Sequence, residues 1–364
     1  MKLIRFFLVI GILALINYCV NTDSDNKELS AKRKAVFYPP KKSPFKNNVG
    51  LCFSVEETNW FNDNSIKYSQ QLKNKYTYER LVNITKTFKL IRIYSYLVAG
   101  WEQTGTLSPE GYAITKVIKN DKSVEALIGT SCNKQWFSDS NNVQAFVDTL
   151  QNQFGSSISQ VKGILIGNEV NANNYLPTDI AVIMINFKKA LRKNNLNIPV
   201  TVTFNNLPNQ KGDTLSDNFV AHVMNNWDSN WNSNYPFVFI DPYPDAKGIN
   251  NAAGVYRWQF GVTRYYKSIY PSLQIFIGET GGEGCGNDYQ TTVVIDSLFS
   301  QLTIQYDSVK RTVPTFLFEA VNEPLKPSSP NQQYMGLFFD SSNPKVTTET
   351  LKANINLPKW FTKK

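Results

Sequence analysis

Histidine is nearly absent from this chain of 364 residues, which contains only His222. One imidazole excludes the metal centres that need several histidine ligands, and it leaves a single candidate for a histidine-based triad. The G-x-S-x-G turn that carries the nucleophilic serine of many hydrolases is also missing. We therefore expect no metal centre, and we expect carboxylates to carry any acid–base chemistry.

Cysteine is scarce as well, with Cys19, Cys52, Cys132 and Cys285 the four in the chain. No two of them have the C-x-x-C spacing of zinc and redox motifs. Removal of an N-terminal leader at Cys19 would leave three in the folded domain. These three allow either one disulfide with a free thiol or three buried thiols.

Charged residues make up only 18% of the chain. Lys and Arg total 38 against 29 Asp and Glu, a net charge of +9, but the basic residues are scattered along the sequence. Proteins that bind nucleic acids usually gather Lys and Arg on one face, so no nucleic-acid partner is expected. The apolar fraction of 42% excludes a disordered chain and is enough for a packed core.

The apolar run Phe6–Ile16 is shorter than the about 20 residues that a membrane-spanning helix needs. Lys2 and Arg5 precede it, and a basic start followed by a short apolar run is typical of a signal peptide. The sequence therefore predicts a signal peptide over residues 1–19, no membrane span, and a protein that is secreted or held at the cell surface or cell wall. A lipid anchor at Cys19 is the alternative fate of this leader.

Residues 20–48 are polar and end in a stretch that contains Pro39, Pro40 and Pro44. This composition predicts a linker or a processed arm. No further break in composition follows, so residues 49–364 are expected to form one domain.

Eight apolar segments of strand length alternate with helical patterns in this domain. Ser108, for example, precedes Pro109 at a predicted helix start, and Gly155 follows an amphipathic helix that ends at Phe154. The predicted strands are Val49–Phe53, Leu90–Tyr94, Val124–Ile128, Gly163–Ile166, Val200–Phe204, Phe237–Ile240, Gln274–Ile277 and Thr315–Phe318.

Strands that are apolar on both faces and alternate with helices indicate a parallel sheet, and eight such units predict a single (β/α)8 TIM barrel. The alternative is an open, doubly wound sheet. That fold commonly carries a G-x-G-x-x-G turn for a dinucleotide after its first strand, and no such turn follows Val49–Phe53. We therefore favour the barrel and expect no cofactor.

In a TIM barrel the chemistry lies at the C-terminal ends of the strands. Glu169 follows the fourth predicted strand and Glu279 follows the seventh. Either glutamate alone would be read as a solvated loop residue or half of an ion pair. Two at matching positions indicate a pair of catalytic carboxylates, the arrangement used to hydrolyse glycosidic bonds.

Five motifs in order along the domain carry a family resemblance. They are Ile91-Arg92-Ile93-Tyr94, Gly167-Asn168-Glu169-Val170, Asp241-Pro242-Tyr243, Gly278-Glu279-Thr280-Gly281, and Phe318-Glu319-Ala320-Val321-Asn322-Glu323-Pro324-Leu325-Lys326 followed by Gly336-Leu337-Phe338. With these motifs the chain resembles glycoside hydrolase family 17, the β-1,3-glucanases and related glucan transglycosylases. The resemblance covers nearly all of the domain after residue 48.

The resemblance implies a retaining double displacement with Glu279 as nucleophile and Glu169 as acid and then base. The two carboxyl groups of a retaining pair stand roughly 5 to 5.5 Å apart. Asn168 would bind the sugar 2-hydroxyl, and Arg92 would either orient the nucleophile or pair with Glu319.

Further substrate-side residues are carried over from the same motifs. They are Tyr94, Tyr243, Phe318 and Glu319. A core aromatic residue is the alternative reading of each ring.

The chain departs from the family pattern at several positions near the cleft. Gly282 and Glu283 stand where the family usually has Trp-Pro, Asn322 where Asp is common, Leu325 where Trp is common, and Gln332 where Glu is frequent. Both predicted catalytic glutamates are retained, so these departures predict an altered preference for substrate length or branching.

The sequence thus predicts a monomeric, secreted β-glucan hydrolase that acts on β-1,3-glucan polysaccharides or oligosaccharides. A β-1,3-glucan transglycosylase that remodels cell-wall glucan is one alternative, and a non-catalytic glucan-binding protein is another. Endo against exo attack, and the linkage and branching preference, stay open.

Overall fold

The computed structural model describes residues 39–40, 43–55, 69–98, 105–130, 133–231, 235–244, 252–282, 285, 287–323, 333–338, 351–352 and 355–362. The chain divides into the units Met1–Tyr38 and Pro39–Lys364, and every described residue belongs to the second. The predicted signal peptide, Cys19 and most of the predicted linker therefore lie outside the described residues.

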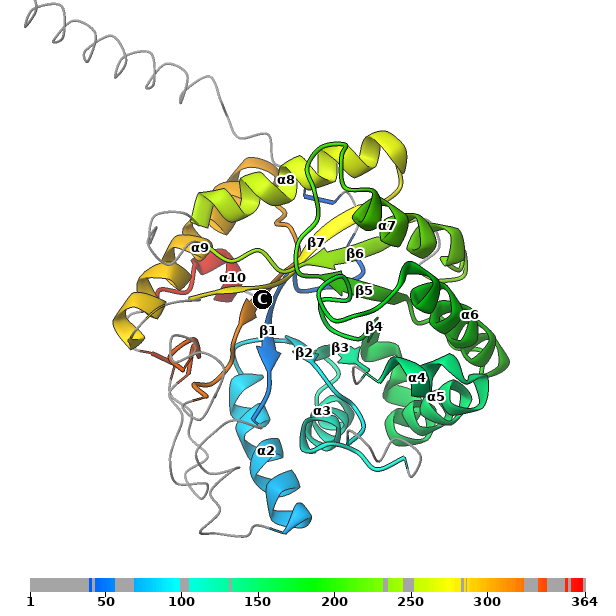
Figure 1. The fold of residues 1–364 in the computed structure, drawn as a ribbon. Helices are drawn as coiled ribbons and strands as arrows, with labels where there is room; N and C mark the ends of the chain where they lie inside the picture. The colour runs from blue at the N-terminus through cyan, green and yellow to red at the C-terminus, as the bar shows by residue number, and fades with distance from the viewer. Residues whose placement is uncertain are drawn as a thin grey trace, which may run out of the picture. The chain divides into compact units, whose positions relative to one another are not determined.

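Eight parallel strands close into a barrel in chain order, with β8 pairing to β1 (Figure 1). The strands are β1 (Val49–Phe53), β2 (Leu90–Ile93), β3 (Glu125–Gly129), β4 (Val161–Ile166), β5 (Val200–Phe204), β6 (Phe237–Ile240), β7 (Gln274–Gly281) and β8 (Thr315–Phe318). The predicted (β/α)8 barrel is confirmed, and the doubly wound alternative is wrong. The largest difference is in β7, which continues through Glu279 because Thr280 and Gly281 pair with β8.

Helices surround the barrel on its outside (Figure 1). They are α2 (Gln70–Ile84), α3 (Pro109–Asn120), α4 (Lys134–Ser138), α5 (Ser140–Phe154), the 3-10 helix η2 (Gly155–Gln160), α6 (Pro177–Lys193), α7 (Thr214–Asn226), α8 (Ala252–Ile269), α9 (Asp288–Val309) and α10 (Lys359–Thr362). Ser108 caps α3 by accepting a hydrogen bond from the Gly111 amide at 2.8 Å, as the sequence predicts. Within the described ranges, no helix combines the length and the apolar character that a bilayer crossing requires.

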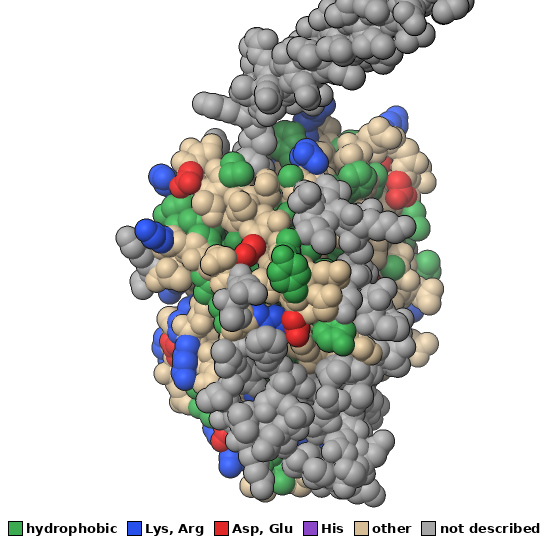
Figure 2. All heavy atoms as spheres, turned by 90° about the vertical axis from the view of Figure 1, so that its left-hand side faces the viewer, with side chains coloured by type: hydrophobic (Ala, Val, Ile, Leu, Met, Phe, Trp, Pro, Cys, Tyr) green, Lys and Arg blue, Asp and Glu red, His purple; other side chains and the backbone are tan. Residues whose placement is uncertain are grey.

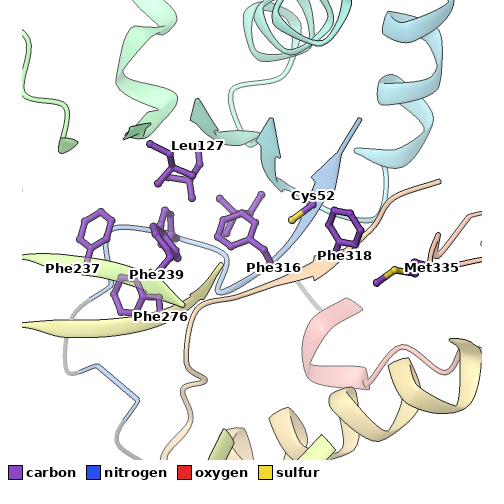
Figure 3. Packing of buried hydrophobic residues seen from close by; sticks show 11 residues of the cluster. Cys52, Leu127, Phe237, Phe239, Phe276, Phe316, Phe318 and Met335 are labelled. Atoms are coloured by element: carbon purple, nitrogen blue, oxygen red, sulfur yellow. The ribbon is translucent and has the colours of Figure 1, made fainter. Parts of the chain in front are cut away.

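A cluster of apolar side chains fills the barrel (Figure 3). Its members are Phe45, Cys52, Leu90, Leu127, Leu165, Phe237, Phe239, Phe276, Phe316, Phe318 and Met335. Phe237 and Phe276 stack with ring centroids 5.2 Å apart. Offset and edge-on contacts of this kind stabilise aromatic clusters beyond the burial of their area. We call this cluster the floor of the barrel.

Phe45 extends this floor from a segment that the sequence assigns to the linker. Its ring contacts Phe237, Phe276 and Phe316 edge-on, with centroids 6.0 to 6.2 Å apart. The amides of the next two residues donate to the buried Glu125 carboxylate at the start of β3, at 2.8 and 3.3 Å. The chain just before β1 is thus part of the barrel, at the end opposite the strand C-termini.

The surface carries mixed charges. On the face in Figure 2, the described Lys and Arg side chains are interspersed with acidic, hydrophobic and other polar side chains. A single-sign field strong enough to steer a polyanion needs a patch of like charges, and the described part of this face presents a mixture instead.

Candidate active site

The predicted site residues converge at the C-terminal ends of the strands. Arg92 lies in β2, Glu169 follows β4, Tyr243 follows β6, and Glu279 lies in β7. Because all strands are parallel, these ends meet at one face of the barrel.

Arg92 connects these residues. The side chain is buried, and its Nη2 lies 3.0 Å from Glu279 Oε1. The same nitrogen donates to Asn168 Oδ1 at 2.6 Å, while Nη1 donates to the Gly278 carbonyl at 2.8 Å. Of the two roles considered for Arg92, these contacts correspond to orienting the predicted nucleophile.

Glu279 is held on both carboxylate oxygens. Arg92 contacts Oε1, and the Tyr243 hydroxyl donates to Oε2 at 2.8 Å. Burial and the negative charge of Glu279 raise the pKa of Tyr243 well above its ordinary value, so the phenol keeps the proton that it donates. A cation on one oxygen and a hydroxyl donor on the other fix the orientation of this carboxylate.

Asn168 is oriented by two donors. Its Oδ1 accepts from Arg92 at 2.6 Å and from the Thr203 hydroxyl at 3.2 Å. Both contacts use the amide oxygen, so the Nδ2 hydrogens are directed elsewhere. This orientation suits a donor to a sugar hydroxyl, the role that the family resemblance implies.

Glu169 has a different setting from Glu279. Its backbone adopts φ +44°, its amide donates to Thr203 Oγ1 at 2.9 Å, and its Oε1 accepts from Asn205 Nδ2 at 3.0 Å. Gly167 precedes it with φ +61°, and a Cβ at that glycine would lie 2.8 Å from the Tyr175 hydroxyl oxygen. The turn after β4 therefore needs glycine there to present the glutamate.

The sequence did not predict Thr203 and Asn205 as residues of the site, although they contact Glu169 and Asn168. Thr203 lies in β5 and Asn205 follows it, and neither belongs to the motifs that carry the resemblance. A polar residue inside an apolar strand, followed by asparagine at the strand end, is the signal that could have indicated them.

Three aromatic rings stand around the same strand ends. Phe318 contacts Tyr94 and Tyr243 edge-on, with centroids 6.2 Å apart in each pair. The Arg92 guanidinium lies 4.8 Å from the centre of the Tyr94 ring. Burial raises the pKa of Tyr94 well above its ordinary value, which keeps this ring neutral beside the cation. The rings pack on the core cluster and also border the predicted substrate side.

Glu319 lies directly after β8 and is buried. Its amide donates to the Met335 carbonyl at 3.3 Å, and its carbonyl accepts from the Leu337 amide at 2.9 Å. The negative charge of Glu319 also reaches Lys352, a buried lysine that the sequence analysis missed.

The departures from the family pattern have physical explanations where they are described. Asn322 donates to Asp288 at 3.0 Å and accepts from Lys352 at 3.1 Å, a combination that an aspartate could not provide. A Cβ at Gly282 would lie 3.0 Å from Thr291 Oγ1 and 3.1 Å from Cys285 Sγ, so an indole there requires a different β7–α9 loop. Glu283, Leu325 and Gln332 lie outside the described residues.

Two of the four cysteines, Cys52 and Cys285, lie among the described residues. Cys52 and Cys285 are free and buried, so they do not form a disulfide with each other, while Cys132 lies outside the described residues. No cluster of three or more His, Cys, Asp or Glu side chains suited to a metal occurs among the described residues.

Solved structures of β-glucan enzymes share this architecture. An active-site mutant of a Rhizomucor miehei β-1,3-glucanosyltransferase, in complex with laminaritriose, is 14% identical over 86% of this chain and 97% of its own, with a TM-score of 0.52. A glycoside hydrolase family 17 β-1,3-glucanosyltransferase from Rhizomucor miehei is 16% identical over the same shares, with a TM-score of 0.51.

A structure from a study of two plant β-glucan endohydrolases is 15% identical over 81% of this chain and 97% of its own, with a TM-score of 0.52. No family model matches the chain, and no curated protein matches it. At these identities the similarity establishes the fold alone.

Proposed function

We propose that the protein is a retaining glycosidase that cleaves β-1,3-glucosidic bonds of β-glucans. The observation that carries the proposal is the placement of Glu279 between Arg92 and the Tyr243 hydroxyl, at the barrel face that also presents Glu169. This is a pair of carboxyl groups with unequal surroundings on one rigid face, which is what double displacement needs.

The surroundings support a division of roles between the two carboxyl groups. Glu279 contacts a guanidinium and a hydroxyl donor, which supports its role as the nucleophile. Glu169 has a neutral amide partner, Asn205, at 3.0 Å and is only half-buried, so it can hold a proton and later exchange it with water.

In the first step, the Glu279 carboxylate bonds to the anomeric carbon while the bond to the leaving glycosidic oxygen breaks. Glu169 gives its proton to that oxygen. In the second step, ionised Glu169 takes a proton from water, the water oxygen bonds to the anomeric carbon, and the ester to Glu279 breaks. Asn168 would strengthen its hydrogen bond to the sugar as charge develops.

The proposed β-1,3 linkage of the substrate and the proposed cellular location of the protein are supported by observations outside the site. The motif resemblance to family 17 and the glucan enzymes among the similar structures favour β-1,3-glucan as substrate. The basic, apolar N-terminus favours secretion or attachment at the cell surface or wall. We propose a monomer that needs no cofactor.

Transglycosylation is the second candidate, because two of the similar structures are glucanosyltransferases. The same covalent intermediate would then react with a sugar hydroxyl instead of water. The two activities share every residue assigned above and differ in whether an acceptor sugar outcompetes water.

The test is product analysis with a linear β-1,3-glucan oligosaccharide of defined length. Shorter products indicate hydrolysis, whereas products longer than the substrate indicate transfer. Glu279→Gln and Glu169→Gln should each abolish turnover while circular dichroism shows an intact fold. If the wild type binds glucan tightly without turnover, the protein is the non-catalytic glucan-binding alternative.

A further inference from the structure

Asp241 is a buried carboxyl group that the mechanism above does not use. It is the first residue after β6, and its amide donates to the Phe204 carbonyl at 3.0 Å. Neither side-chain oxygen accepts a hydrogen bond of standard geometry, although the Glu279 backbone amide lies near the carboxyl. Among the buried carboxyl groups of the described residues, Asp241 alone has both oxygens in this condition.

The Asp241 carboxyl group occupies space that a neighbouring glycine, Gly278, leaves open. A Cβ at Gly278 would lie 2.5 Å from Asp241 Oδ1, 2.9 Å from Phe239 Cβ and 3.0 Å from Arg92 Nη1. Any larger residue at position 278 would therefore displace the Asp241 carboxyl group or the Arg92 guanidinium. Asp241 is held against the strand that carries the predicted nucleophile.

The cation beside Asp241 is already engaged. Arg92 Nη1 lies 3.7 Å from Asp241 Oδ1, against 3.0 Å between Arg92 Nη2 and Glu279 Oε1. Arg92 also donates to Asn168 and to the Gly278 carbonyl. An ionised Asp241 would thus be a second carboxylate sharing one guanidinium, with the Glu279 backbone amide as its only further donor among the described residues.

The titratable groups around Asp241 also favour its protonated form. Burial raises the pKa of Asp241 well above its ordinary value, and the negative charges of Glu279 and Glu169 raise it further, while Arg92 opposes them. Two further neighbours, Cys52 and Tyr243, have pKa values raised by burial, so both stay neutral and add no charge beside Asp241.

We propose that Asp241 is a positioning residue that stays protonated at neutral pH, so that Arg92 serves a single ionised carboxylate, Glu279. The protonated state follows from the contacts alone, whereas the benefit to catalysis rests on the proposed glycosidase function. A neutral Asp241 keeps the guanidinium on Glu279. Its ionisation would pull Arg92 away from the nucleophile and set a second negative charge beside it.

Infrared spectroscopy of the full chain at neutral pH tests the protonation state without any assay of activity. The wild type should show the C=O stretch of a protonated carboxylic acid that disappears in Asp241→Asn. Glu169→Gln identifies any band that belongs to the predicted acid. The proposal is overturned if Asp241→Asn, with a wild-type circular dichroism spectrum, removes no protonated band.

Kinetics test the positioning role. Asparagine has the shape of protonated aspartic acid, so Asp241→Asn should keep kcat/KM within about threefold of wild type, with an unchanged pH profile. If Asp241 were the ionised partner of Arg92, the same variant would lose more than about tenfold and shift the profile. A wild type inactive on every β-glucan would refute the glycosidase proposal and leave the infrared result intact.

Discussion

At the scale of single residues, one guanidinium determines the geometry of the site. Arg92 contacts Glu279 at 3.0 Å and Asn168 at 2.6 Å, so a charge from β2 aligns groups from β7 and from the end of β4. Arginine suits this position because its planar donors reach several acceptors at once and stay protonated.

Tyr243→Phe tests the second contact of the nucleophile. Removing the hydroxyl takes away the 2.8 Å hydrogen bond to Glu279 Oε2, and hydrogen bonds to charged groups are worth about 1.5 to 3 kcal/mol. We expect kcat/KM to fall about 10- to 100-fold, measured by steady-state kinetics on a β-1,3-glucan oligosaccharide.

Tyr265→Phe is the matched control for this variant. The Tyr265 hydroxyl also donates to a carboxylate, Asp217 at 2.9 Å, but this pair joins α8 to α7 on the outside of the barrel. The activity of the Tyr265→Phe variant should stay at the wild-type level. Equal losses in the two variants would contradict the role assigned to Tyr243.

At the scale of elements, a buried lysine joins the C-terminal part of the chain to the barrel. Lys352 Nζ lies 2.6 Å from Asp288 at the start of α9 and donates to Asn322 at 3.1 Å and to the Tyr334 carbonyl at 3.0 Å. These contacts connect the segments that follow β7 and β8, and the charge of the buried Glu319 also acts on Lys352.

Lys352→Met should lower the free energy of unfolding by about 1.5 to 3 kcal/mol at neutral pH, because three acceptors lose a charged donor. Lys75→Met is the control, since the exposed Lys75–Glu79 pair at 3.9 Å should contribute at most about 1 kcal/mol. Denaturant titration measures both. Equal effects of the two substitutions would contradict the account of Lys352.

The pH dependence of the same variant gives a further check. Burial lowers the pKa of Lys352 below its ordinary value of 10.5, so the folded chain releases this proton at a lower pH than the unfolded chain. Over that window the unfolded state binds more protons, and the free energy of unfolding gains a contribution that rises with pH. Wild type minus Lys352→Met should show this rise as pH approaches 10.5.

At the scale of the whole molecule, a segment that precedes the first strand covers the end of the barrel opposite the strand C-termini. Phe45 packs into the aromatic floor, and the amides of Lys46 and Asn47 bind the buried Glu125. All of these residues belong to the unit Pro39–Lys364.

Two shortened chains test where the barrel begins. A chain beginning at Pro39 should keep the wild-type free energy of unfolding and activity. A chain beginning at Val49 loses Phe45, and removal of a buried phenylalanine side chain costs about 3 to 5 kcal/mol. Thermal and denaturant unfolding measure both, and equal stability of the two chains would show that Phe45 is dispensable.

The sequence by itself determined the barrel, the strands and the two predicted catalytic glutamates. Apolar runs and helical periods are local patterns, and a glutamate close to the end of an apolar run is visible without knowing its spatial neighbours. The β7 boundary was missed because pairing with β8, and not the apolar run, keeps Thr280 and Gly281 extended.

Only the tertiary structure decided which residues meet. Arg92 and Glu279 are far apart in sequence, and barrel closure brings them to 3.0 Å. The same closure leaves both Asp241 side-chain oxygens without a hydrogen bond of standard geometry and packs Phe45 into the apolar cluster. Contacts between distant segments depend on strand register and packing across the barrel, and no local pattern in a single sequence encodes them.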